Sequence, residues 1–222
     1  MSKSSNLIDK IMLGKSRLPE DSDRFGEWFD KSQNIYRAYY HIKDEIDSKK
    51  VFRNELLKYI PIGSVACIQG YFSLAIRDII DYGPPYRDNI LKLSKDIKFD
   101  MEPILGVFDG KITLGEFISA LLPIRNLEVI NFYMTSLLDI RFLDKLRNQK
   151  ITVPDRNSQY SFSDDADKVY ADIHKIFEDR HIFCHELAPL KKPKLEETKR
   201  LFDNASLFIM ATEPLIYSML SK

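Results

Sequence analysis

Apolar residues recur at intervals of three and four along most of this chain, whereas the strict alternation typical of strands is hard to find. The first clear helix is expected from residue 23 onward, and Asp23 is a suitable N-cap for it. Its apolar positions are Phe25, Trp28, Phe29, Ile35, Tyr36, Tyr39, Ile42 and Ile46. An aromatic stripe of this kind usually packs into a core, and in some proteins it forms a surface on which nucleic-acid bases stack.

The strongest helical segment spans residues 54–82, with Pro61 as a candidate break or kink. Beyond Pro61 the sequence leaves almost no polar face, which predicts a helix in the middle of a bundle. Gly83, Pro84 and Pro85 then end the segment.

The rest of the chain also favours helices, so the predicted fold class is all-α. Pro123 marks an expected break, residues 148–160 are polar and predicted to form a loop, and Ser163 is the expected N-cap of the helix that follows. Further helices are expected over residues 89–97, 166–177 and 194–220, and residues 113–146 are expected to form one or two helices.

The composition is that of an ordinary globular protein of one domain, with 222 residues, 44% hydrophobic and 30% charged. The formal net charge is zero, so no protein-wide field attracts nucleic acid, although a local basic site remains open.

The cysteines and the apolar runs indicate a reduced, cytoplasmic setting without a membrane span. Cys67 and Cys184 lie far apart and form no metal or disulfide pattern, and we expect no signal peptide. The longest apolar zone, residues 117–138, is interrupted by Arg125, Asn126, Glu128 and Asn131.

Residues 105–116 imitate part of a calcium-binding loop. Gly110 and Glu116 fall at the right offsets, but Leu105 and Val107 occupy ligand positions and offer no side-chain oxygen. We therefore expect a turn before a helix and no calcium.

Groups able to do chemistry crowd together only at residues 180–185, Arg-His-Ile-Phe-Cys-His. Four residues separate Arg180 from His185, the polar His181 directly follows the arginine, and the motif lies between two expected helices. This arrangement resembles the signature of the HEPN family, in which an arginine is followed, after four to six residues, by a histidine.

The resemblance implies a helical domain, often a dimer, and often a metal-independent ribonuclease without a cofactor. The stretch from Gln69 to Ile80 also resembles an early core helix of HEPN domains, where a polar residue points toward the active site, and Gln69 is the matching position. Members of the family commonly act as toxins of toxin–antitoxin pairs or in defence against phage, which implies an antitoxin or a defence protein as a partner.

The residue types of the motif suit RNA cleavage by attack of the ribose 2′-hydroxyl on the adjacent phosphorus. Histidine carries protons near neutral pH, and arginine can fork onto two phosphate oxygens. In a regular helix, however, five residues turn the chain by about 140°, so Arg180 and His185 would not share a face. They converge if a helix begins between them, or if a second copy supplies its own pair, as the resemblance implies.

A basic patch follows the motif. Glu196 and Glu197 are the acids within it, and its cations are Lys191, Lys192, Lys194, Lys199 and Arg200. We expect Lys191, Lys192 and Lys194 to bind RNA phosphates, and the alternative is a solvated helix start.

Other interpretations of the same residues stay open. His181 and His185 are four apart and would suit zinc, with Cys184 or Glu186 joining, but a third histidine would have to be His174 or His41. Cys184 is expected to be a buried, inert thiol rather than a nucleophile. The motif can also be structural, with Arg180 bound to a neighbouring carboxylate. Arg125 and Asn126 start no second motif, because no histidine occurs at the next ten positions.

The sequence therefore predicts an N-terminal arm at residues 1–22 and a helical domain at 23–222, and the resemblance implies that this domain is HEPN-like with extra helices inserted at 83–162. The expected function is endoribonuclease, with Arg180, His181 and His185 as catalytic residues. A non-catalytic, dimeric HEPN-like module that binds a partner or a nucleotide is the alternative.

Overall fold

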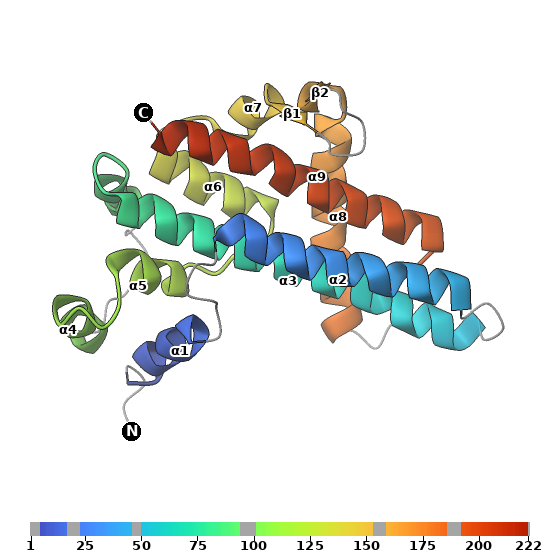
Figure 1. Ribbon diagram of the computed structural model, residues 1–222, viewed down its shortest axis with the longest axis horizontal. Helices are drawn as coiled ribbons and strands as arrows, with labels where there is room; N and C mark the ends of the chain where they lie inside the picture. Colours follow the sequence, from blue (N-terminus) through green and yellow to red (C-terminus); the bar gives the residue numbers. More distant parts are fainter. Residues whose placement is uncertain are drawn as a thin grey trace.

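The computed structural model describes residues 5–16, 23–45, 50–93, 101–152, 159–185 and 192–221. Helices make up most of these residues, which confirms the all-α fold class (Figure 1). The α-helices are α1 (Ser5–Lys15), α2 (Arg24–Glu45), α3 (Lys50–Tyr82), α4 (Met101–Phe108), α5 (Leu114–Leu121), α6 (Leu127–Leu138), α7 (Phe142–Arg147), α8 (Ala166–His185) and α9 (Leu195–Leu220). The shorter elements are the 3-10 helices η1 (Arg87–Lys92) and η3 (Phe162–Asp164) and the strands β1 (Lys150–Thr152) and β2 (Gln159–Ser161).

Helix α3 is the centre of the fold, as its all-round apolar sequence predicts. It packs against α2, α5, α6, α8 and α9, and Figure 1 shows α2 and α9 running along it while α8 crosses behind. Val65, Ile68, Ala75 and Ile79 are fully buried. Pro61 lies inside the helix without ending it. The helix is held from several sides at once, which burial of its apolar faces requires.

The same apolar character makes residues Arg53–Tyr82 long and apolar enough to cross a membrane by length and composition alone. Of the apolar window, 56% is buried inside the protein. The central helix of a bundle meets the same criteria of length and composition.

Helix α2 begins where the sequence predicts. The backbone N–H of Gly26 donates to the Asp23 carboxylate at 2.8 Å, so Asp23 is the N-cap. The aromatic stripe enters the core mainly through Trp28 and Tyr39, whereas Phe29 and Tyr36 remain exposed.

The turn before α5 is built as expected in place of a calcium loop. The Thr113 hydroxyl accepts the N–H of Glu116, and the Glu116 carboxylate accepts the N–H of Thr113, which forms a capping box. From the end of α3, Asp81 accepts further hydrogen bonds from the Thr113 hydroxyl at 2.6 Å and the Gly115 N–H at 2.8 Å. A carboxylate at a helix N-terminus is favourable, and here it fastens α5 to α3.

Several local predictions are wrong, and residues 113–146 form the three helices α5, α6 and α7 in place of one or two. The segment predicted as a loop contains the hairpin of β1 and β2, in which buried Ile151 pairs with Tyr160. Ser163 does not cap α8, because its hydroxyl donates to Asp164 within η3 and α8 begins at Ala166. The helix expected at 89–97 is the 3-10 helix η1, and residues 94–97 lie outside the described part of the chain.

Candidate functional site

The motif lies inside the last turns of α8, and not at the start of a new helix. Helix α8 continues past the predicted end at residue 177 to His185. Arg180 and His185 are thus five residues apart in one helix, and five positions of a regular helix turn the chain by about 140°. Of the two geometries that would bring them together, only a second copy remains. The side chain of His185 and all of Lys191 lie outside the described residues.

Arg180 and His181 line a hollow that we call the arginine hollow, with a volume of about 430 Å³. It is formed by α3, by the connection between α5 and α6, and by α8. Its lining residues are Val65, Gln69, Pro123, Ile124, Arg125, Phe177, Arg180 and His181. Two arginines, a histidine and an amide thus border one space with an apolar floor.

Gln69 fixes one wall of the arginine hollow. Its side-chain amide donates to the carbonyl of Ile124 at 2.6 Å, which fastens the α5–α6 connection to α3. The matching position that the HEPN resemblance singled out therefore lies beside Arg180 and His181 in the same space. Its amide hydrogen bond is committed to the backbone, so its clearest role is to position the connection.

Arg125 reaches the arginine hollow because the next residue starts a helix. The Asn126 side chain accepts the N–H of Val129 at 2.9 Å and caps α6, which sets the direction of the chain before it. Burial raises the pKa of the nearby Tyr133 hydroxyl, and the positive charge of Arg125 opposes that rise. Sequence reasoning set Arg125 aside for lack of a following histidine. The feature that could have identified Arg125 is a cation directly before a helix N-cap in an otherwise apolar zone.

The carboxylate directly before Arg180 is engaged by another cation. Asp179 is buried, and the Lys175 ammonium lies 3.3 Å from it and 3.3 Å from Glu197. Burial acts to lower the pKa of Lys175, but the two carboxylates outweigh it and the pKa is raised. This ion pair joins α8 to α9 directly behind the motif.

The basic patch is partly neutralised. Lys199 pairs with Asp203 at 2.6 Å and Arg200 with Asp172 at 3.1 Å, as expected for a solvated helix face. Lys192 and Lys194 are exposed just before α9, at the end of the chain segment that follows the motif.

The described residues hold no group of three or more His, Cys, Asp or Glu side chains that could bind a metal ion. His174 lies 3.2 Å from Glu128 on α6. Cys184 is exposed, contrary to the buried thiol expected, because α8 extends one turn beyond the residues that pack into the core.

No family model, curated protein or solved structure matches this chain. The function is therefore argued from the arrangement of its own residues.

Proposed function

We propose that this protein is a metal-independent endoribonuclease of the HEPN type that acts as a twofold dimer. The observation that carries the proposal is the arginine hollow, where Arg180 and His181 of the motif meet Arg125 from a distant segment. A phosphate needs this kind of surrounding, with two planar cations able to make forked hydrogen bonds.

The chemistry assigned to the site is an internal transfer within RNA. The 2′-oxygen forms a bond to phosphorus, the bond from phosphorus to the 5′-oxygen breaks, and a 2′,3′-cyclic phosphate results. A base takes the proton of the 2′-hydroxyl, and an acid gives a proton to the leaving 5′-oxygen.

Each residue has a separate role in this proposal. Arg180 and Arg125 hold the phosphate oxygens and stabilise the charge of the transition state. His185 carries the proton transfer, and His181 orients the substrate beside Arg180. Exposed Lys192 and Lys194, with Lys191, attract the neighbouring phosphates.

The test is cleavage of a fluorescent single-stranded RNA by purified protein. Arg180→Lys and His185→Ala are expected to fold and to lose about 100-fold or more in rate, because a lysine cannot make the forked contact and an alanine cannot transfer a proton. Arg141→Ala is the matched control, since Arg141 is exposed directly before α7 and lies 3.5 Å from the carboxylate of Asp144, away from the arginine hollow. Cleavage is expected to survive EDTA.

Three results would contradict the proposal. Loss of cleavage in EDTA, restored by zinc, would favour a metal site at His181 and His185. Unfolding of both motif variants would make the residues structural, and unchanged cleavage by both would move the active site elsewhere.

The second candidate is a dimeric HEPN-like module that binds a partner or a nucleotide without cutting. The wide angle between Arg180 and His185 along α8 favours it, because one chain alone does not gather a cation and a proton carrier on one phosphate. RNA binding by the parent protein without any cleavage would select this candidate.

A further inference from the structure

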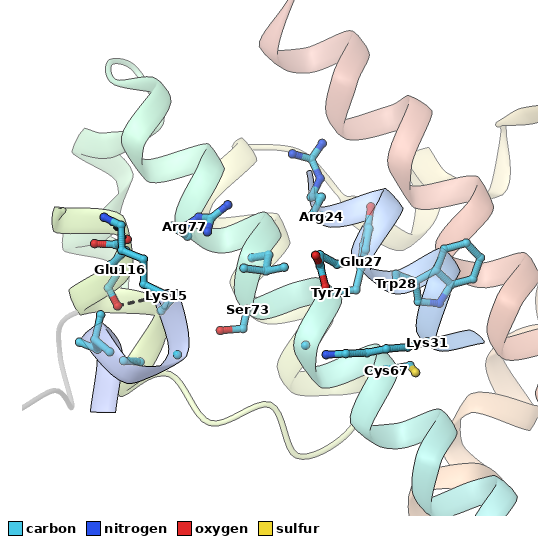
Figure 2. Close-up of a pocket in the computed structure, with 16 residues that line it drawn as sticks. Lys15, Arg24, Glu27, Trp28, Lys31, Cys67, Tyr71, Ser73, Arg77 and Glu116 are labelled. Carbon is cyan, nitrogen blue, oxygen red and sulfur yellow. Dashed lines mark hydrogen bonds and ion pairs between the residues drawn. The ribbon is translucent and has the colours of Figure 1, made fainter. Parts of the chain in front are cut away.

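A second cavity, which we call the α1 cavity, lies on another face of α3. It has a volume of about 290 Å³ and is enclosed by α1, α2, α3 and α5 (Figure 2). Pockets that hold small molecules range from about 300 to 1,000 Å³, so this one suits a ligand of the smallest kind. Its apolar lining includes Ile11, Trp28, Leu74 and Ala120.

Part of the polar wall of the α1 cavity is already satisfied. Arg24 makes two hydrogen bonds to Glu213, at 2.8 and 2.9 Å, and one to Asp78 at 2.9 Å. The Tyr71 hydroxyl donates to Glu213 at 2.7 Å, and Arg77 lies 2.7 Å from Asp78. These groups balance one another in charge and form a rigid side of the cavity.

Two opposite charges on α2 remain without partners. Glu27 and Lys31 both line the α1 cavity, one helical turn apart, and neither side chain forms an ion pair or hydrogen bond within the part of the chain that the structure describes. In Figure 2 the two side chains extend in different directions, with Lys31 lying across the cavity. The Ser73 hydroxyl, which also points into this space, makes no hydrogen bond with the described residues.

Gly70 keeps the floor of the α1 cavity open. It lies in the middle of α3, where alanine would be more favourable by about 1 kcal/mol. A Cβ atom at this position would meet nothing within 4 Å, so packing does not require a glycine. Because glycine has no side chain, the backbone of α3 is uncovered at this wall of the cavity. Glycine is expected at such a position where a ligand approaches the backbone closely.

We propose that the α1 cavity binds a small zwitterion with an apolar body, which is the chemistry of a free hydrophobic amino acid. Glu27 receives the ammonium, Lys31 receives the carboxylate, and the apolar part packs against Trp28 and its neighbours. A ligand with both signs offers an opposite charge to each of the two side chains, and its apolar part is removed from water against Trp28, which is itself buried. This inference does not depend on the proposed nuclease activity.

Helix α1 would complete the site as one of its walls. Ile11, Gly14 and Lys15 line the cavity from α1, and the Lys15 ammonium holds that helix to Glu116 of α5 at 3.0 Å. A bound ligand would therefore touch α1, α2 and α3 together.

Calorimetry with the full chain tests the proposal, using L-phenylalanine and L-leucine as probes. 3-Phenylpropanoate lacks the ammonium and 2-phenylethylamine lacks the carboxylate, so each is expected to bind about tenfold or more weakly than L-phenylalanine, the loss of one hydrogen-bonded charge. If either half-ligand binds as tightly as L-phenylalanine, the zwitterion assignment is wrong. It is also wrong if neither amino acid binds at about 10 mM, a concentration that would reveal even a dissociation constant in the millimolar range.

Variants locate the site. Glu27→Gln and Lys31→Gln are each expected to weaken L-phenylalanine binding about tenfold or more. Asp30→Asn and Lys43→Gln are the matched controls, because these side chains are exposed on the same helix, as Lys31 is, but do not line the α1 cavity. Gly70→Leu is expected to fill the cavity and abolish binding while the thermal melt shows a folded protein. Binding unchanged in Gly70→Leu, or in both charge variants, would overturn the proposal.

Discussion

Arg24 carries a largely buried charge that is held by two carboxylates. Only 10% of its side chain is exposed, between Glu213 and Asp78. Burial acts to lower its pKa, but the negative charge of Glu213 and its other neighbours outweighs burial, so the pKa is raised. Burial, together with Glu213, also raises the pKa of Tyr71 well above its ordinary value. The charged group is therefore kept in the core only as long as its partners remain.

Removal of one partner should be costly. Glu213→Gln is expected to lower the free energy of unfolding by about 2–4 kcal/mol, because it leaves the Arg24 charge buried without its forked partner. Lys92→Gln is the control, since Lys92 and Asp139 are 45% and 77% exposed, and should change stability by less than about 0.5 kcal/mol. Urea unfolding measures both, and equal effects would contradict the prediction.

Asp167 gives a prediction about pH. Its carboxylate accepts two hydrogen bonds from the Arg147 guanidinium, and this pairing lowers its pKa from the ordinary 3.8. The depressed pKa means that the pair stabilises the fold above pH 3.8 and that this contribution is lost as pH falls through the lower value in the folded state. In an NMR titration, Arg147→Gln should return the Asp167 pKa to its ordinary value. A midpoint unchanged by the substitution would show that the pair is not formed in solution.

At the scale of elements, two glycines should respond to alanine in opposite ways. A Cβ at Gly115 would lie 2.3 Å from the backbone oxygen of Arg77, so Gly115→Ala should separate α5 from α3 and cost about 1–3 kcal/mol. Gly70→Ala meets open space in mid-helix and should add about 1 kcal/mol. Thermal or urea unfolding of the two variants measures the contrast, and a loss of stability in both would refute it.

The helices were predictable from the sequence because each buries a continuous apolar face. The N-cap role of Asp23 follows from its residue type and its place before an apolar period. The central position of α3 follows from apolar residues on all its sides. The end of α8 was not predictable, because its last turns carry polar residues that give no apolar period. The hairpin of β1 and β2 is fixed by burial of Ile151 and by pairing with distant residues, and short strands leave little local pattern.

The candidate site was predictable only in part. Arg180 and His181 stand out through their spacing with His185, but Arg125 enters the arginine hollow through the tertiary fold, 55 residues away from Arg180 in sequence. Such a contact depends on the Asn126 cap and on the Gln69 hydrogen bond to Ile124. Neither is visible as a periodicity.

At the scale of the whole molecule, the proposed function predicts a dimer. In one chain, positions 180 and 185 are about 140° apart around the axis of α8, so the proposed phosphate site requires the pair of a second copy. Light scattering at micromolar concentration should give twice the mass of 26.0 kDa. A monomer that still cleaves RNA would contradict the shared site.

The central position of α3 has a consequence for how the protein opens. An amide in its buried middle, from Val65 to Ile80, can exchange its hydrogen only when the helices around it have all separated. Helix α1 packs mainly on α4 and α5, and its amides can exchange when it lifts away alone. Deuterium labelling should therefore show the slowest exchange in the middle of α3, at the rate of global unfolding, and much faster exchange in α1.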